Sequence, residues 1–391
     1  MEVIFLLGAV QAFFLASLIP TKKQNLLSDK ILFVWLVILG VLLLDHYLEM
    51  KEIVFRYPHL LGLTYTLPLL IGPALYLYIL SLTIDKGQLD MFQYLHFIPF
   101  VVFTLFFLFD YYFLGAEAKL AYYHQQSEVD TSLIILITEV FLIFSPPLYA
   151  IISLFRINKH QQEIADCFSY TERINLNWLK FIVYFHLFFG LISLITNLFS
   201  DIIPVMPFWM GDSLVYATSV AYIFILGYFG IKQQKIYPAI LTENTRLKSE
   251  VKTEIMQSDR DLPVSRRYQN SGLKEEEKAI YLEKLLLLMK KEKPYLDNKL
   301  SLKDLAGKME LSVNHISQII NELLHKNFFD FVNMYRVEEV KEKLSDKKFA
   351  HFSLLAIAYE CGFNSKSAFN HIFKKITGQT PSEYQKNIEE N

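Results

Sequence analysis

Seven long apolar windows dominate the first 230 residues of this 391-residue chain. A helix needs about 20 apolar residues to cross the ~30 Å hydrocarbon core of a membrane, whereas a buried helix of a water-soluble protein gives runs of about 10–14. The windows therefore predict a bundle of seven transmembrane helices. They cover residues 2–19, 30–48, 65–83, 92–114, 132–155, 178–199 and 209–230.

Lysine and arginine are distributed unevenly among the loops between these windows. Cytoplasmic loops retain positive charge, and alternate loops here hold seven basic residues in one set and three in the other. With seven spans, the bias places Met1 outside and everything after Gly230 in the cytoplasm. We therefore expect a multi-pass protein of the bacterial cytoplasmic (inner) membrane. The richer set is Lys22, Lys23, Lys30, Lys86, Arg156, Lys159 and Arg173.

Ionisable side chains interrupt five of the windows. Such a group costs at least about 2.5–3.5 kcal/mol at the bilayer centre and usually faces the interior of the bundle. Two interpretations remain open: an outward-opening polar pocket for a signal, or interhelical hydrogen bonds together with carboxylates near enough to the surface to reach water. The residues of this predicted signal pocket are Asp45, Asp110, Glu139, His186 and Asp212.

The composition gives no support to an enzyme or a metal centre. The two cysteines, Cys167 and Cys361, lie in different parts of the chain, so they form neither a disulfide framework nor a four-cysteine zinc cluster. No HExxH or GxSxG motif occurs among the apolar windows. We expect no enzymatic activity, no cofactor and no metal.

Residues 231–277 separate the apolar part from a soluble one. Ile240, Leu247, Val251 and Ile255 recur at helical spacing. This pattern predicts a juxtamembrane helix, which either pairs with a second copy as a short coiled coil or lies on the membrane surface. Residues 258–272 are polar and are expected to form a tether.

Residues 278–391 contain two copies of a helix, tight turn, helix pattern. The copies superpose at an offset of 52 residues before the turn and 53 after it, as the pairs Ala306/Ala358 and Ile320/Phe373 show. Residues 329–344 are expected to form one connecting helix about 24 Å long. The apolar positions of the first copy are Leu302, Leu305, Ala306, Met309, Ile316, Ile319, Ile320 and Leu323, and those of the second are Leu354, Ile357, Ala358, Cys361, Phe369, Ile372, Phe373 and Ile376.

A turn this short leaves the outer face of the second helix free to enter a DNA major groove. That face is polar in both copies. Asparagine and glutamine can pair with adenine, and lysine can reach guanine or phosphate. The predicted DNA-binding residues are Asn314, Ser317, Gln318 and Asn321 in the first copy, and Lys366, Ser367, Asn370, His371 and Lys374 in the second.

The basic excess of this part is small, with 18 Lys and Arg against 15 Asp and Glu in residues 278–391. DNA-binding domains are usually more basic, so we expect modest affinity for DNA. Glu338, Glu339 and Glu342 place negative charge on the connecting helix. The side chains expected on phosphates are Lys366, Lys374, Lys375 and Arg336.

The run IAYECGFNSKSAFNHIFKK at residues 357–375, followed by GQTP at 378–381 and by Tyr384, resembles the C-terminal signature of the AraC/XylS transcriptional regulators. The resemblance covers about residues 280–387. It implies two helix-turn-helix units whose second helices read bases, and it adds Val313 to the predicted DNA-binding residues. This chain departs from the pattern at Gln385, where the family commonly has arginine, and at His371, where a longer side chain is frequent.

The whole chain is also similar to a membrane-tethered subset of that family, through the sequence GPALYLY at residues 72–78. That similarity implies a sensor in residues 1–230, a juxtamembrane helix and linker in 231–277, and an AraC-type domain in 278–391. The predicted fold is all-α. A signal is expected to pass through the seventh span to the linker helix.

The predicted function is a membrane-tethered, sequence-specific transcriptional regulator. Its expected partners are double-stranded promoter DNA and the lipid bilayer, with RNA polymerase and a second copy of the chain as further candidates. The alternative is a transporter or receptor whose helical tail binds a protein partner. A third hypothesis is proteolytic release of the tail by a cut between residues 260 and 272. The signal ligand is not indicated by any motif.

Overall fold

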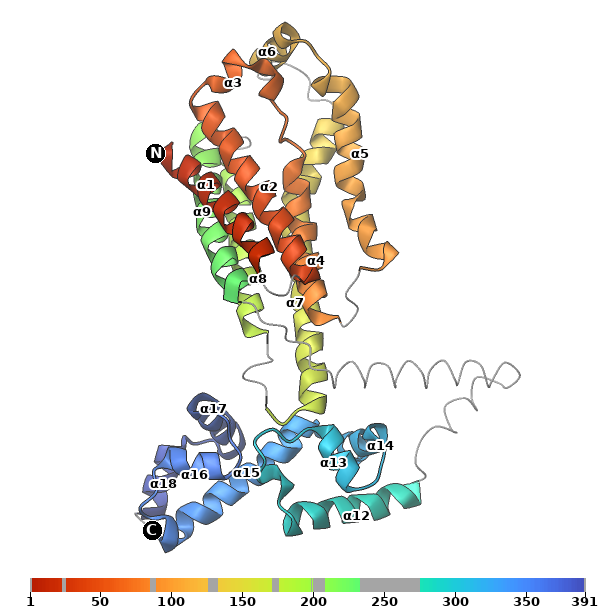
Figure 1. Cartoon of the computed structure of the whole chain (residues 1–391), viewed down its shortest axis with the longest axis vertical. Helices are drawn as coiled ribbons and strands as arrows, with labels where there is room; N and C mark the ends of the chain where they lie inside the picture. Colours follow the sequence, from red (N-terminus) through yellow and green to blue (C-terminus); the bar gives the residue numbers. More distant parts are fainter. Residues whose placement is uncertain are drawn as a thin grey trace, which may run out of the picture. The chain divides into compact units, whose positions relative to one another are not determined.

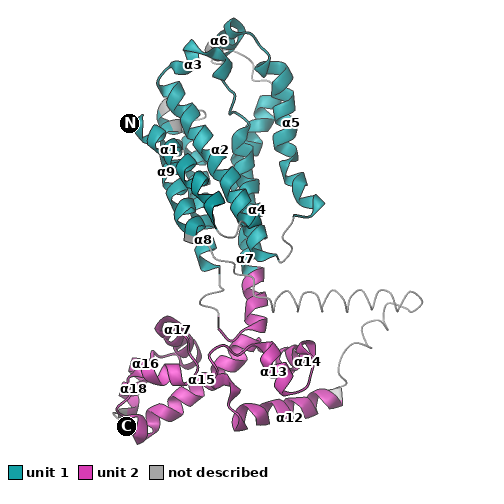
Figure 2. Cartoon of the chain, viewed as in Figure 1, with its two compact units in different colours: residues 1–158, 176–235 teal, residues 159–175, 236–391 magenta. Residues whose placement is uncertain are grey.

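The structure, a computed structural model, describes residues 2–22, 26–84, 89–125, 133–170, 176–197, 199, 208–232 and 275–389. The described residues are all-helical, as predicted, apart from one isolated antiparallel bridge between Phe168 and Ser301. The chain divides into two compact units (Figure 2). The first comprises Met1–Asn158 and Leu176–Lys235, and the second comprises Lys159–Asn175 and Ile236–Asn391.

The first unit is built from long apolar helices (Figure 1). Helix α1 packs against α2 and α9, α2 packs against α4, and α8 packs against α9. The helices are α1 (Val3–Leu18), α2 (Leu27–Met50), α3 (Ile53–Arg56), α4 (Ile71–Thr83), α5 (Ile98–Phe107), α6 (Ala116–Gln125), α7 (Leu133–Cys167), α8 (Asn177–Asn197) and α9 (Phe208–Lys232). Short 3-10 or π segments are η1 (Ile19–Thr21), η2 (Pro58–Leu60), η3 (Leu67–Leu70), η4 (Met91–Phe97) and η5 (Leu108–Tyr112).

Large aromatic side chains fill the interior of the first unit. Trp35 of α2 is fully buried and meets the ring of Tyr222 of α9 edge to face at 5.7 Å and the ring of Tyr78 of α4 at 6.2 Å. Such edge-to-face pairs add to the free energy that burial of the rings already provides. This cluster joins three of the predicted spans.

Six helices of the described residues are long and apolar enough to cross a membrane. The predicted third window forms a shorter apolar segment, Leu67–Thr83. The count of seven spans is therefore not confirmed. The six are Val3–Thr21, Leu27–Met50, Met91–Tyr112, Leu133–Cys167, Asn177–Thr196 and Ser213–Ile231.

Helix α7 is longer than its apolar window. The window ends at residue 155, but the helix continues to Cys167, through Arg156 and Lys159. Its last turns belong to the second unit, which therefore contains a segment from between two apolar helices.

The second unit has two hydrophobic cores that share one helix. The first half of α15 contributes Phe331 and Val332 to one core, and its second half contributes Val337 and Val340 to the other. This helix has 18 residues and is about 27 Å long at 1.5 Å per residue. The elements are α12 (Glu275–Lys291), η7 (Pro294–Leu296), α13 (Leu302–Lys308), α14 (Val313–Gln318), η8 (Ile319–Leu323), α15 (Phe328–Ser345), η9 (Lys347–Phe349), α16 (Leu354–Glu360), α17 (Lys366–Thr377) and α18 (Pro381–Glu389).

The juxtamembrane helix and the tether predicted between residues 233 and 274 lie outside the described residues. Helix α12 begins at Glu275, three residues before the predicted start of the DNA-binding domain.

Candidate nucleic-acid interface

The first helix-turn-helix unit consists of α13, a short turn and α14. Glu310 in the turn has φ +54°, and the Leu311 N–H donates to the Ala306 carbonyl at 3.0 Å, which reverses the chain. The next helix begins at Ser312, whose Oγ accepts from the His315 N–H at 3.2 Å. Serine at this position satisfies one of the free N–H groups of the helix start.

The second helix-turn-helix unit repeats the same geometry. Gly362 has φ +86°, and the Phe363 N–H donates to the Ala358 carbonyl at 3.0 Å, as in the first turn. Helix α17 begins after Ser365, whose Oγ accepts from the Ala368 N–H at 3.1 Å. The turns and caps thus recur at the predicted spacings of 52 and 53 residues.

The outer face of α14 and η8 carries the predicted DNA-binding residues of the first helix-turn-helix unit. Asn314 and Asn321 are exposed, and Ser317 is half-buried. The Asn321 amide donates to Ser317 Oγ at 3.2 Å. Gln318 is less available, because its amide donates to both carboxylate oxygens of Glu322 at 3.0 and 3.1 Å.

Val313 lies at the edge of this face. It is half-buried and packs against the first hydrophobic core. Only part of its side chain is accessible.

Helix α17 presents a sharper division between its two faces. Phe369, Ile372 and Phe373 are buried on the inner side. The outer side carries five exposed polar residues, which are Lys366, Ser367, Asn370, His371 and Lys374. The structure therefore gathers all the predicted DNA-binding residues of the second helix-turn-helix unit on one exposed face.

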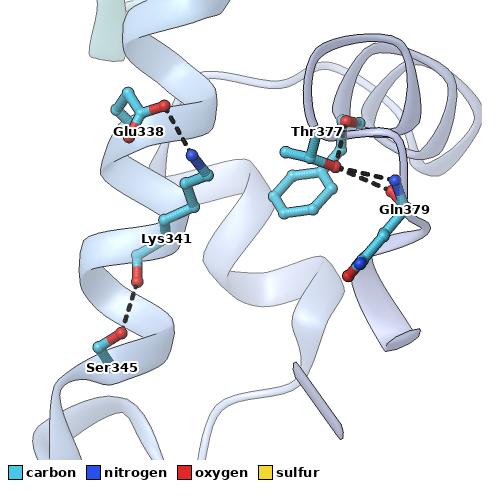
Figure 3. A network of polar contacts seen from close by, with 6 residues as sticks. Glu338, Lys341, Ser345, Thr377 and Gln379 are labelled. Atoms are coloured by element: carbon cyan, nitrogen blue, oxygen red, sulfur yellow. Dashed lines mark hydrogen bonds and ion pairs between the residues drawn. The ribbon is translucent and has the colours of Figure 1, made fainter. Parts of the chain in front are cut away.

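The end of α17 is held by local hydrogen bonds. Thr377 donates to the Phe373 carbonyl at 2.8 Å and accepts from the Gln379 N–H, while Gly378 adopts φ +78° (Figure 3). Glu383 accepts from the Thr380 N–H at 2.8 Å, and this bond lowers the pKa of its carboxyl group. The Thr377 bonds thus end α17, and the Thr380–Glu383 bond lies at the start of α18.

Arg336 of α15 is predicted to contact phosphates, and this prediction is wrong. Arg336 is 1% exposed, so it does not contact phosphates. Glu339 is 8% exposed and accepts from Lys293 Nζ at 2.7 Å and from the Tyr295 hydroxyl at 2.9 Å. Lys375 remains exposed but pairs with Asp330 at 2.7 Å.

The Glu339 cluster titrates in a defined direction. Burial opposes ionisation of the carboxyl group, but the hydrogen bonds from Lys293 and Tyr295 outweigh it and lower the pKa of Glu339. The same contact raises the pKa of Lys293, and burial raises the pKa of Tyr295. Lys293 and Glu339 therefore stay ionised at neutral pH, and their ion pair joins the segment before the first helix-turn-helix unit to α15.

Cys361 lies in the turn of the second helix-turn-helix unit. Burial raises the pKa of its thiol to about 12, so it is protonated at neutral pH. The described residues contain no group of three or more potential metal ligands.

Where the structure describes them, the predicted signal-pocket residues lie in different surroundings. Asp45 is half-buried and accepts from Thr64 at 2.5 Å, whereas Asp110 and Glu139 are exposed. His186 is fully buried and lies 3.2 Å from the Tyr222 hydroxyl. Asp45 thus bonds a residue of the turn between η2 and η3, and His186 lies beside a residue of α9, so the signal pocket stays a prediction. The side chain of Asp212 lies outside the described residues.

Residues 164–170, which contact Arg336, carry no sequence signal of this role, because they lie in a predicted loop between two spans. Arg336 itself carried a signal, since it lies four residues from both Val332 and Val340 on one helix face. Both valines are fully buried. A charged residue in the middle of a buried stripe indicates a specific set of partners.

The geometry of these two units defines the class of the domain. Each has two helices joined by a tight turn, an N-capped second helix and an exposed polar face. Residues 305–387 match a family model described as a helix-turn-helix domain. This part of the chain is therefore a helix-turn-helix domain, a class of DNA-binding structure.

Two regulators are similar to this domain. The melibiose operon regulatory protein of Escherichia coli K12 is 30% identical over 90 residues, which is 23% of this chain and 29% of the relative. An uncharacterized HTH-type transcriptional regulator of Staphylococcus aureus is 35% identical over 86 residues, which is 22% of this chain and 11% of the relative. The chain thus spans less than a third of the curated relatives it matches, and no solved structure matches it significantly.

Proposed function

We propose that this chain is a membrane-anchored transcriptional regulator of the AraC type, whose two recognition helices bind one two-part site in promoter DNA. The observation that carries the proposal is the pairing of α14 and α17, two capped helices with exposed polar faces, on opposite halves of α15. The similarity to two regulators supports it.

The exposed asparagine amides would contact the base edges. Asn314 and Asn370 can each donate and accept against the edge of an adenine, and such a bidentate contact discriminates by about 1–3 kcal/mol. Lys366 and Lys374 at the two ends of the exposed face of α17 would contact guanine or phosphate.

The first unit would anchor this domain in the cytoplasmic membrane. Six helices have the length and composition for spanning, and the 17-residue segment Leu67–Thr83 reaches the lower limit of about 17 residues for a seventh. We therefore retain seven spans in the proposal.

Contacts within the first unit support the predicted orientation. Lys22 donates to the Gly230 carbonyl at 2.6 Å, and Arg156 donates to the Thr83 carbonyl at 2.7 Å. The basic residues of the cytoplasmic set therefore contact the ends of α4 and α9 that are expected on the same side. At the opposite ends, Lys51 pairs with Glu2.

Selection of random duplex DNA by the full chain in lipid nanodiscs tests the DNA-binding part. We expect enrichment of a two-part site about one helical turn long (~34 Å). The double variant Asn314→Ala with Asn370→Ala should lose the enrichment. Asn387→Ala, which removes an exposed asparagine amide from α18, is the matched control and should retain it.

The opposite result has a specific meaning. Binding without sequence preference, together with solute flux in vesicles that contain the chain, would favour a transporter or receptor whose tail recruits a protein. A soluble DNA-binding fragment in place of the full chain would favour proteolytic release.

A further inference from the structure

The end of α7 and the three residues after it dock on the DNA-binding domain. We name residues 164–170 the docking segment. Ile164, Phe168 and Ser169 in it are each 1% exposed. All of these residues belong to the second unit, together with α12 to α18.

Backbone and side-chain bonds fix the docking segment on the turn that precedes α13. Phe168 forms the isolated antiparallel bridge with Ser301. The Ser169 N–H and hydroxyl both donate to the Leu300 carbonyl, at 3.3 and 2.7 Å. The Ser169 carbonyl accepts from the Asn333 amide at 3.2 Å. One serine thus contacts both the stretch that precedes α13 and α15 itself.

Arg336 completes this contact. A guanidinium group has five N–H donors in a fixed planar arrangement, and here five acceptors meet them. Three come from the DNA-binding domain itself: the Tyr295 carbonyl at 2.8 Å, the Asp297 carbonyl at 2.8 Å and Asn333 Oδ1 at 3.2 Å. The other two come from Ser169, its carbonyl at 2.9 Å and its hydroxyl at 3.0 Å.

The same stretch also holds the second helix-turn-helix unit. The Asn364 amide donates to the Asn298 carbonyl at 2.7 Å. A Cβ atom at Gly362 would lie 2.4 Å from the Tyr295 carbonyl and 2.9 Å from Arg336 Nε, so the turn of the second unit lies directly against the Arg336 site. Residues 295–301 therefore contact the docking segment and both units.

We propose that the docking segment is an internal ligand of the DNA-binding domain, and that its binding at Arg336 holds the two recognition helices in the arrangement that fits a two-part DNA site. The inference rests on the proposed function. Without Ser169, two donors of a buried guanidinium lose the acceptors described above, and the junction between the units loosens. A rigid junction presents both helices at once, which strengthens two-part binding without any new DNA contact.

The test compares DNA binding by full-length variants in nanodiscs of phosphatidylethanolamine and phosphatidylglycerol. Ser169→Pro removes the N–H and the hydroxyl, and Ser169→Ala removes only the hydroxyl. Ser345→Ala is the matched control, because its exposed Oγ bonds only the Lys341 carbonyl of its own helix among the contacts shown in Figure 3. Each is titrated with the selected two-part duplex and with a duplex in which one part is scrambled.

We expect Ser169→Pro to raise the Kd for the two-part duplex about tenfold and Ser169→Ala about threefold, while the Kd for the scrambled duplex stays within about twofold. Unchanged binding of the scrambled duplex also shows that each variant is folded. Hydrogen exchange should quicken in residues 164–170 and 295–301 of Ser169→Pro and stay unchanged in α17.

Two outcomes would overturn the inference. Equal or tighter two-part binding by Ser169→Pro would show that docking does not favour the DNA-binding arrangement, and unchanged hydrogen exchange would show that the segment does not dock. Failure of the unsubstituted chain to select any duplex would instead refute the proposed function, so the two failures are distinguishable.

Discussion

Replacing Gly362 by alanine should destabilise the DNA-binding domain more than the conformation of this residue alone requires. Gly362 has φ +86°, and an added Cβ would lie 2.4 Å from the Tyr295 carbonyl and 3.0 Å from the Leu296 carbonyl. Both neighbours are backbone atoms, which cannot rotate away as a side chain could. The backbone itself has to shift.

The magnitude follows from three contributions. The left-handed conformation costs a non-glycine residue about 1–2 kcal/mol, and overpacking against rigid neighbours costs about 1–3 kcal/mol. Alanine recovers about 0.4–1 kcal/mol because it restricts the unfolded chain. The expected loss in the free energy of unfolding is therefore about 2–4 kcal/mol, or a fall of about 10–20 °C in Tm for a domain of this size.

Gly378→Ala is the matched control for the clash. Gly378 has φ +78°, but no atom lies within 4 Å of an added Cβ. We therefore expect it to lose only about 1 kcal/mol. Glu310, at the equivalent position of the first turn, shows that a non-glycine residue can hold this conformation, since its φ is +54°.

Thermal unfolding can be followed by maleimide labelling of Cys361 in the full chain, with Cys167→Ala present in every sample. Cys361 is fully buried and lies next to Gly362. Equal losses in the two glycine variants, or a neutral Gly362→Ala, would refute the reasoning that the Tyr295 carbonyl limits this position.

Three further predictions concern other parts of the domain. Asn370→Ala should leave Tm unchanged, because the side chain is exposed. It should weaken binding to the selected duplex by about 1–3 kcal/mol in a filter-binding titration. Weaker binding to every duplex alike would contradict base reading. Since Glu339 has a lowered pKa in the folded state, its stabilising contribution is present above the ordinary pKa of a glutamate side chain and is lost as the pH falls through the folded pKa. Glu339→Gln should therefore be less stable at pH 7 and show a flatter stability profile between about pH 5 and 3, as measured by urea denaturation, whereas parallel profiles would exclude this role. Cys361, with its pKa raised to about 12, should react with iodoacetamide at pH 8 only after the domain unfolds, and rapid labelling of the native chain would show that the turn is open.

The two helix-turn-helix units could be predicted from sequence because local patterns determine them. The repeated apolar spacing indicates which faces are buried, and the constant offset between the two copies indicates that their turns are alike. The connecting helix was predicted at residues 329–344 and extends over Phe328–Ser345, a difference of one residue at each end. The exposed positions followed from the same periodicity.

The Arg336 site could not be predicted in this way. Its partner Ser169 is 167 residues away along the chain, and periodicity within one helix carries no information about contacts at that separation. The charge of Arg336 suggested a phosphate contact, but its position between Val332 and Val340 decided its burial. In the first compact unit, likewise, the apolar windows located Asp45 and His186 on helices without indicating which side chains they contact.

The central claim is that the intact chain binds promoter DNA while it is anchored in the membrane. The most direct measurement is formaldehyde cross-linking in intact cells, followed by isolation of membranes, capture of the full 45.8 kDa chain and sequencing of the attached DNA. We predict a discrete set of promoter segments that share one two-part motif and that disappear with Asn314→Ala plus Asn370→Ala. DNA of random sequence on the full chain, or specific DNA found only on a soluble fragment, would contradict the account.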